Sequence, residues 1–372
     1  MMEEQIYSMA LTFIPGLGNT TARVLIDKMG SAREVFEHRN EIIERIEGCN
    51  PKIPRMLDSR EAFHRAEAEM RYDIEKGIEC IPMTDERYPA RLRECPDAPL
   101  VLYYKGSCPL ETQKVMAVVG TRRATHYSED LIRRFMSDLR EMVPEVLVMS
   151  GLAYGVDILA HRASLENGYN TIGVLAHGLD RIYPASHRRT AAEMVRQGGL
   201  LTEFPTGSNP DKKNFVLRNR IVAGMSDAVI VTESADRGGA LITAGLAFDY
   251  SRECFAFPGR VGDRYSEGCN KIIRENKARL ITSAEDFVKA MSWDVKPRSK
   301  SMAVQLPLFP DLTAEEELVV KELRKDSDGL QINLLTIRTG LPVAKLSSIL
   351  FELEMKGVVR TQAGGMYRVV VI

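Results

Sequence analysis

The pattern of hydrophobic and polar positions divides the chain into three parts. Residues 1–77 carry long periodic stretches, such as residues 59–76, and no run typical of a strand, which predicts a helical region. Between residues 78 and 291, short apolar runs alternate with amphipathic segments, for example residues 128–143, that are long enough for crossover helices. Residues 313–372 form a third, smaller part that begins with helical periodicity.

Seven short apolar runs in the middle part predict the strands of a parallel sheet. Most of them are continuous rather than alternating, which is typical of strands buried on both faces. They lie at Val115–Val119, Val146–Met149, Thr171–Ala176, Leu200–Phe204, Ala228–Thr232, Cys254–Phe257 and Leu280–Thr282. Together with the helical segments between them, these runs predict an α/β fold built on a doubly wound parallel sheet.

The segment between the second and third parts has no periodicity. Residues 292–312 contain three prolines, so we interpret them as a linker. The predicted organisation is therefore a helical domain at residues 1–77, an α/β domain at residues 78–291, the linker, and a small domain at residues 313–372.

The third part predicts a winged helix. Thr313 is placed to cap the first helix, Gly340-Leu341-Pro342 forms a turn, and Gly364-Gly365 is a hairpin signal. The expected elements are helices at Ala314–Leu323, Ile332–Arg338 and Val343–Met355, and a hairpin over Val358–Val370. This order is typical of a winged helix-turn-helix domain.

Composition narrows the classes of function. Lys and Arg total 50 and Asp and Glu total 51, which excludes a strongly basic chain that binds nucleic acid through bulk charge. The six cysteines form no CxxC pair and have no histidine at metal-ligand spacing, so we expect reduced cysteines, no metal site and no cofactor. No apolar run approaches ~20 residues and the N-terminus shows no signal pattern, so we expect a cytoplasmic protein without membrane contact.

Three glycine loops follow predicted strands and indicate a site for an anion. They contain Gly120, then Gly151 and Gly155, then Gly238 and Gly239. The carboxyl ends of parallel strands lie at one edge of a sheet, where free amides at helix starts favour phosphate. We favour this interpretation over glycines that serve only tight turns. No GxxxxGK[ST] or GxGxxG motif is present, which disfavours a P-loop hydrolase and a dinucleotide oxidoreductase.

A basic segment suggests which anion is bound. Residues 205–225 hold four basic residues against Asp211 alone, a local charge of +3, and Phe215 lies among them. The basic residues are Lys212, Lys213, Arg218 and Arg220, and Arg122 and Arg123 follow the first strong strand. An aromatic among cations suits single-stranded nucleic acid, whose bases stack while its phosphates follow the charge.

Other roles for these residues remain open from the sequence. Phe215 shares a helix face with Arg218 and Val222 and would then belong to the core. Arg218 and Arg220 cannot share a face, and at least one of them would pair with an acid to brace the sheet edge. The candidate acids are Glu203, Asp157 and Glu233. Arg122 and Lys212 are the better candidates for phosphate.

Asp157 and His161 lie four residues apart on a predicted helix. A hydrolase would use them as an acid–base couple, but no nucleophile in a suitable setting accompanies them. We therefore expect a structural Asp–His hydrogen bond.

Six motifs of the middle part resemble those of a known family. They are Val118–Ser128, Ser150–His161, Gly178–Pro184, Phe215–Gly224, Gly238–Ala244 and Phe257–Gly259. In this order they are similar to those of the bacterial DNA-processing family DprA, also called Smf. The resemblance implies an extended Rossmann-like domain that binds and protects single-stranded DNA, forms a homodimer, and helps to load the RecA recombinase during natural transformation.

By position, the resemblance implies roles for individual residues. Arg122 and Lys212 match residues that contact DNA phosphate, and Phe215 matches an aromatic that meets a base. The loop glycines match those that line the pocket. The predicted DNA-binding set is Gly120, Arg122, Arg123, Gly151, Gly155, Lys212, Phe215, Arg218, Arg220, Gly238 and Gly239.

The flanking parts are less specific. Residues 14–19 resemble the turn of a helix-hairpin-helix, which would hold a DNA phosphate, whereas the family resemblance implies a sterile-alpha-motif-like helical domain. The third part holds eight basic and eight acidic residues, and its predicted recognition helix contains Glu352 and Glu354. A neutral winged helix binds phosphate poorly, so we expect a protein-contact or regulatory module.

The sequence thus predicts a DNA-binding protein that is not an enzyme. The alternative is a Rossmann-like enzyme that hydrolyses nucleoside monophosphates. Such enzymes generally carry a Pro-Gly-Gly-x-Gly-Thr-x-x-Glu loop. Residues 236–241 lack the glutamate of that pattern.

Overall fold

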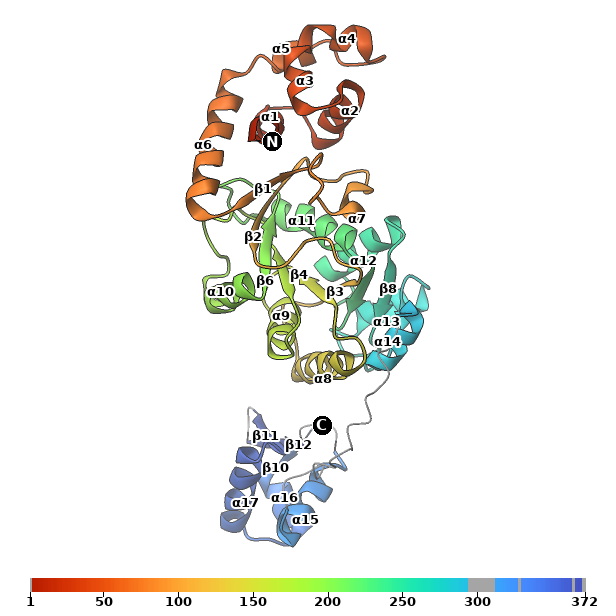
Figure 1. The fold of residues 1–372 in the computed structure, drawn as a ribbon. Helices are drawn as coiled ribbons and strands as arrows, with labels where there is room; N and C mark the ends of the chain where they lie inside the picture. The colour runs from red at the N-terminus through yellow and green to blue at the C-terminus, as the bar shows by residue number, and fades with distance from the viewer. Residues whose placement is uncertain (1, 294–311, 327–328, 363–364, 370–372) are drawn as a thin grey trace. The chain divides into compact units, whose positions relative to one another are not determined.

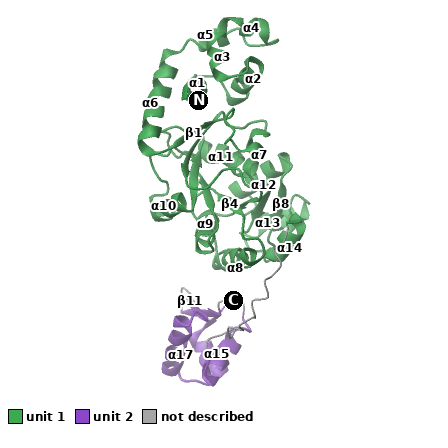
Figure 2. Ribbon diagram, viewed as in Figure 1, with its two compact units in different colours: residues 1–296 green, residues 297–372 purple. Residues whose placement is uncertain are grey.

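The computed structural model describes residues 2–293, 312–326, 329–362 and 365–369 (Figure 1). The chain forms two compact units, residues 1–296 and residues 297–372 (Figure 2). Most of the predicted linker, residues 294–311, lies outside the described residues.

The first part of the chain is helical, as the periodicity predicts. Its helices are α1 (Met2–Phe13), α2 (Asn19–Met29), α3 (Ala32–Glu37), the 3-10 turn η1 (Arg39–Glu41), α4 (Ile42–Arg45), α5 (Ile53–Met56) and α6 (Arg60–Lys76). The long α6 begins where the Ser59 side chain accepts a hydrogen bond from the Ala62 amide, and it ends at Gly77 in the left-handed conformation. These helices belong to the same compact unit as the sheet that follows.

Nine strands form the sheet of the first unit, in the order β1-β2-β6-β5-β4-β3-β7-β8-β9. They are β1 (Glu79–Pro82), β2 (Val101–Gly106), β3 (Val115–Val119), β4 (Leu147–Ser150), β5 (Thr171–Val174), β6 (Gly198–Thr202), β7 (Ala228–Val231), β8 (Glu253–Ala256) and β9 (Arg279–Leu280). The seven predicted strands are confirmed as β3–β9, and neighbours among them are parallel. The sequence did not predict β1 and β2, which extend the sheet with antiparallel pairing.

The sheet is doubly wound about β3. Strands β4–β6 lie on one side of β3 and β7–β9 on the other, so the strand order reverses between β3 and β7. Along β3, Ala117 packs in one apolar cluster, while Met116 and Val118 pack in another on the opposite face. Both faces of this strand are therefore buried, which explains its unbroken apolar sequence.

Helices cover both faces of this sheet. The remaining helices of the first unit are α7 (Ala90–Arg93), α8 (His126–Met142), α9 (Val156–Glu166), the 3-10 turn η2 (Ala185–His187), α10 (Arg188–Arg196), α11 (Lys212–Met225), α12 (Gly239–Asp249), α13 (Glu267–Arg274) and α14 (Ala284–Met291). Just after α14, the Trp293 ring packs edge-on against Phe287, with 5.2 Å between centroids. All six cysteines are free thiols, as expected, and all but Cys49 are buried in the packed interior.

The second unit is a winged helix, as predicted. It consists of α15 (Ala314–Leu323), β10 (Leu330–Gln331), α16 (Ile332–Thr339), α17 (Val343–Met355), β11 (Val359–Gln362) and β12 (Met366–Val369). Thr313 and Glu316 form a reciprocal capping box at the start of α15, and Gly340 ends α16 in the left-handed conformation. The strands pair in the order β10-β12-β11. Of the predicted hairpin glycines, Gly365 is described, whereas Gly364 lies outside the described residues.

A search of the described helices for membrane spans finds none that qualifies singly by length and apolar character. The pair α16 and α17 meets those two criteria only when joined across a bend of 108°.

Candidate functional site

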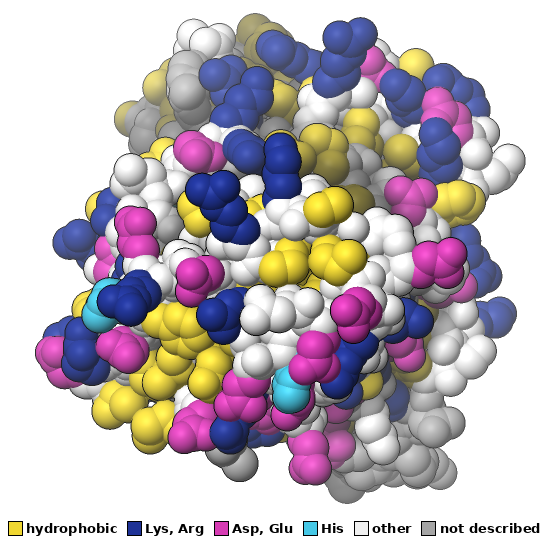
Figure 3. Space-filling model, turned by 90° about the horizontal axis from the view of Figure 1, so that it is seen from above, with side chains coloured by type: hydrophobic (Ala, Val, Ile, Leu, Met, Phe, Trp, Pro, Cys, Tyr) yellow, Lys and Arg dark blue, Asp and Glu magenta, His cyan; other side chains and the backbone are white. Residues whose placement is uncertain are grey.

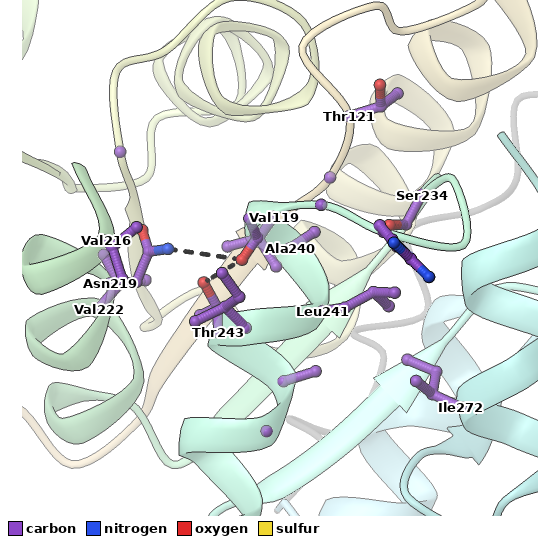
Figure 4. A pocket seen from close by; sticks show the side chains of 18 of the residues that line it. Val119, Thr121, Val216, Asn219, Val222, Ser234, Ala240, Leu241, Thr243 and Ile272 are labelled. Carbon is purple, nitrogen blue, oxygen red and sulfur yellow. Dashed lines mark hydrogen bonds between the residues drawn. The ribbon is translucent and has the colours of Figure 1, made fainter. Parts of the chain in front are cut away.

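A cavity of about 1400 Å³ opens at the carboxyl edge of the sheet, where the strand order reverses. This is the position at which open α/β sheets bind ligands. Its walls come from the loops after β3, β4 and β7 and from α11 and α12 (Figure 4). Eight predicted residues line it together: Gly120, Arg122, Gly151, Lys212, Phe215, Arg218, Gly238 and Gly239.

The loop after β3 is held by the loop after β7. The Thr121 amide donates to the Glu233 carbonyl at 2.7 Å, and the Thr125 amide and hydroxyl donate to the Glu233 carboxylate at 2.9 and 2.6 Å. Glu233 is buried, so these bonds fix the loop that carries Arg122. Glu233 therefore binds Thr125, and not an arginine as one sequence alternative proposed.

Arg122 and the first turn of α11 meet at the cavity wall. The helix begins at Lys212, where Asp211 accepts a hydrogen bond from the Asn214 amide at 2.8 Å. One turn later, the Arg122 guanidinium carbon lies 4.7 Å from the centroid of the Phe215 ring, a cation–π contact. Phe215 is half-buried and lines the cavity, so its assignment to the core is wrong.

Arg218 forms part of the cavity floor. Its side chain is buried and donates to the carbonyls of Gly151 and Val174, which joins the ends of β4 and β5. A Cβ on Gly151 would lie 2.2 Å from the Arg218 guanidinium, so glycine is required there to leave room for the charge. Burial raises the pKa of the neighbouring Asp157, and the Arg218 charge opposes that shift.

Arg220 has a different environment from Arg218. It is buried on the opposite side of α11 in an ion pair with Glu203, with 2.5 Å between Nη2 and Oε2, and it does not line the cavity. The predicted bracing pair with Glu203 is thus confirmed. The geometry gives Arg220 no access to a ligand in this cavity.

Two other predicted residues also lie outside the cavity lining. Arg123 is exposed beside Arg122, and its amide donates to the Thr121 hydroxyl at 3.1 Å. Gly155 has a φ of +75°, and a Cβ there would lie 2.2 Å from the Thr121 carbonyl oxygen. Gly155 therefore lets the loops after β3 and β4 pack closely. It lies against the backbone of Thr121 and Arg122.

Gly238 and Gly239 face open space. A Cβ on either would meet nothing closer than 3.7 Å, so internal packing does not require glycine here. Gly239 begins α12, and its carbonyl accepts from the Thr243 hydroxyl at 3.1 Å and from the Asn219 amide at 3.5 Å (Figure 4). The first amides of α12 have no partner within the helix and lie at the positive end of its dipole, which favours an anion at this wall.

Positive charge is concentrated locally in the cavity. Six of its charged lining residues are Lys or Arg and four are Asp or Glu. On the face of the molecule shown in Figure 3, by contrast, basic and acidic side chains are interspersed.

The expected hydrogen bond between Asp157 and His161 is wrong. His161 Nδ1 lies 2.7 Å from the Thr171 hydroxyl, and Asp157 instead accepts from the Ala153 amide at 3.3 Å. Burial lowers the pKa of His161 to about 3, so the ring is neutral at physiological pH. In the part of the chain that the structure describes, the side chains grouped closely enough to hold a metal ion are Glu34, Glu37 and His38, at the end of α3 and not in the cavity.

The structure adds residues to the site that the sequence did not single out. Asn219, between the two buried arginines, and Lys271, on α13, both line the cavity. Lys271 is 2.8 Å from Asp236 in an ion pair across the cavity rim. Lys271 could have been found only from the strand order, because α13 follows β8, the neighbour of β7.

Comparison with known proteins identifies the family. The model for DNA recombination-mediator protein A matches residues 79–292, and the model for the DprA winged helix domain matches residues 307–365. DNA processing protein DprA from Bacillus subtilis is 36% identical over 247 residues, which is 66% of this chain and 78% of that protein. Protein Smf from Escherichia coli is 34% identical over 299 residues, 77% of this chain and 76% of that protein.

Solved structures agree with these matches. DNA processing protein A from Streptococcus pneumoniae aligns with a TM-score of 0.61 at 32% identity, covering 77% of this chain and 96% of that one. DNA processing protein A from Helicobacter pylori, described for its single-stranded DNA binding mode, aligns with a TM-score of 0.53 at 29% identity, covering 59% of this chain and 97% of that one. With its Rossmann-like sheet and its winged helix, the chain belongs to the DNA recombination-mediator protein A family, the DprA/Smf family whose motifs it carries.

Proposed function

We propose that this chain binds single-stranded DNA in the cavity between the loops after β3 and β7. The observation that carries the proposal is that Arg122, Lys212 and Phe215 line the same cavity, with Arg122 against the Phe215 ring. A single strand presents phosphates and unpaired bases. The two exposed cations bind the phosphates, and the aromatic ring beside them stacks on a base. A duplex hides its bases, so this site favours single strands.

The parts of the site have distinct roles in this proposal. Arg122 and Lys212 neutralise phosphates, and the amides at the start of α12 add a third point of positive potential. Phe215 provides a face on which a base stacks, and its contact with Arg122 holds that arginine in place before DNA arrives. The buried Arg218 shapes the floor and contributes its charge from below.

The family suggests the wider role. We propose that the protein acts in the cytoplasm as a homodimer joined through its Rossmann-like domain, protects single strands during natural transformation, and helps to load RecA onto them. We also propose that it is a binding protein and not an enzyme. Residues 236–241 lack the glutamate of the loop by which the nucleoside-monophosphate hydrolases are known.

Fluorescence anisotropy with labelled oligonucleotides tests the proposal. We expect tighter binding of a single strand than of a duplex of the same length, and a moderate loss of affinity as the salt concentration rises from about 50 to 200 mM, because only a few phosphates are neutralised. Arg122→Ala with Lys212→Ala is expected to nearly abolish binding without changing the thermal unfolding midpoint, because both side chains are exposed.

A matched control separates the site from general charge. Lys213→Ala with Arg134→Ala removes two exposed cations that do not line the cavity, and this variant should bind within a few fold of the wild type. Equal losses in the two double variants, or no loss in the first, would overturn the assigned site. A nucleoside monophosphate that is hydrolysed by the wild type and not by the Arg122/Lys212 variant would favour the enzyme alternative.

A further inference from the structure

An exposed aromatic side chain adjoins the cavity without lining it. Tyr183 lies on the loop between β5 and α10, and 45% of its surface is exposed. Its ring centroid is 6.0 Å from that of Phe215, with an interplanar angle of 54°. The two rings therefore touch, one at the cavity wall and the other outside it.

The backbone at Tyr183 is held by a hydrogen bond to a buried histidine. Its amide donates to Nε2 of the buried His177 at 3.3 Å, and His177 Nδ1 faces the Gly178 carbonyl at 2.8 Å. Since Nε2 accepts, the ring proton is on Nδ1 and is donated to that carbonyl. Tyr183 is thus presented on a fixed support and not on a loose loop tip.

The same loop is tied to the start of α11. Arg181 donates to the Asn209 side chain at 2.9 Å, and the Asn214 side chain donates to the Asn209 carbonyl at 3.0 Å. Asn214 is on the first turn of α11, between Lys212 and Phe215. The loop with Tyr183 and the turn with Lys212 and Phe215 therefore form one hydrogen-bonded surface.

Further exposed aromatic and basic side chains continue this surface. Tyr154, half of whose surface is exposed, packs edge-on against His187 at 5.0 Å, and His187 is four residues beyond Tyr183. Arg181 on this loop, which is paired with Asp180 at 2.9 Å, and Arg188 at the start of α10 are both exposed. Exposed rings interleaved with arginines are the usual features of a surface that binds single strands.

We propose that Tyr183 is a second base-stacking contact, so that the bound strand leaves the cavity across Phe215 and Tyr183 toward Tyr154. This inference rests on the proposed function and extends it from a pocket to a path. It assigns to Tyr183 a direct contact with a base and not a supporting contact with Phe215 alone.

Substitution of Tyr183 tests the contact through binding of an oligo-dT strand. Tyr183→Ala and Tyr183→Leu should weaken binding by about 5-fold or more, since stacking contributes measurably for each base. Tyr183→Phe keeps the ring and should bind like the wild type. The salt dependence of the affinity should stay the same in all three variants, because no phosphate contact is lost.

Two further measurements exclude an indirect effect. A strand with abasic sites keeps its phosphates but offers no base, and it should bind the wild type and Tyr183→Ala equally. Adding Tyr183→Ala to Phe215→Ala should lower the affinity again if Tyr183 meets its own base. No further loss in that background, or equal losses on the normal and abasic strands, would overturn the inference.

The outcome also separates this inference from the proposed function. If Arg122→Ala with Lys212→Ala abolishes binding while Tyr183→Ala leaves it unchanged, the cavity binds DNA and the path is wrong. If the Arg122/Lys212 variant still binds fully, the proposed site itself is wrong.

Discussion

Glycines that look alike in the sequence have different physical causes in the structure. Gly151 is required by its neighbour, because the Arg218 guanidinium occupies the space that a Cβ would need. Gly239 has no such neighbour and borders the open cavity. The first glycine therefore serves the fold, and the second leaves space that a ligand can use.

Alanine at these two positions should separate stability from binding. Gly151→Ala is expected to destabilise the protein by about 1–3 kcal/mol, because the methyl group overpacks a buried charge. Gly239→Ala should leave stability unchanged or raise it by up to about 1 kcal/mol, because alanine favours a helix, while it weakens binding of single-stranded DNA. Urea unfolding and anisotropy measure the two effects.

The opposite pattern would contradict these assignments. A stable Gly151→Ala variant would mean that Arg218 can move aside, and unchanged DNA binding by Gly239→Ala would remove the start of α12 from the site.

The two arginines of α11 show where sequence reasoning at single residues ends. The helical spacing predicted that Arg218 and Arg220 face different sides, and the structure confirms it. Spacing alone could not say which side holds the cavity, because that depends on Glu203 and Gly151, each on a different strand end. The sequence predicted Arg122 and Phe215 for one site, but their direct contact depends on the strand order and could not be derived from spacing along the chain.

At the scale of elements, strands buried on both faces were the easiest to predict. Val115–Val119 is apolar throughout and was located to the residue. The strand β1 was not predicted because Glu79–Pro82 ends in proline, a residue that is uncommon inside strands, and β2 was not predicted although its first four residues are apolar. Burial does not distinguish β2 from the parallel strands, since Val101–Tyr104 is apolar and buried; both missed strands lie in the antiparallel part of the sheet.

The long helix α6 joins the helical region to this edge through buried acids. Glu69 accepts from the Thr206 amide and hydroxyl, both at 2.6 Å, and is paired with Arg65 at 2.7 Å. One turn later, Asp73 is buried with one carboxylate oxygen unpartnered. Burial, and then the nearby Glu69 charge, raise the pKa of Asp73 to about 8, while Arg65 opposes the shift.

Asp73 should make stability fall as the pH rises from about 4 to about 8. In that range the unfolded chain has released the Asp73 proton and the folded protein still holds it, so each step up in pH favours unfolding. The loss from this group is at most about 1.4 kcal/mol per pH unit. The Asp73→Asn side chain cannot titrate. Between pH 5 and pH 8 the unfolding midpoint of this variant should therefore rise relative to that of the wild type. Parallel curves for the two proteins would show that Asp73 is ionised in the folded state.

At the scale of the molecule, the near-zero net charge no longer opposes a nucleic-acid partner. The net charge of the chain is the sum of a locally basic segment, residues 205–225, and parts that are neutral or acidic, such as residues 313–372 with eight basic and eight acidic residues. Binding at one shaped site implies a small number of phosphate contacts, and hence a moderate number of released counterions.

Removal of the second unit tests how much of the molecule the site needs. A chain ending at residue 296 retains the whole first unit and every predicted contact of the cavity. Its affinity for single-stranded DNA should stay within a few fold of the full chain, because residues 313–372 carry equal numbers of basic and acidic residues. A large loss of affinity in anisotropy measurements would show that the winged helix binds DNA.

The edge-on packing of Trp293 on Phe287 gives the protein an internal optical reporter. Trp293 is the single tryptophan of the chain and belongs to the first unit, so its emission follows the unfolding of that unit alone. Circular dichroism in the far ultraviolet follows the helices of both units. Comparing the two signals during one denaturation therefore separates the unfolding of the winged helix from that of the sheet domain. The measurement needs neither an attached label nor a truncated chain.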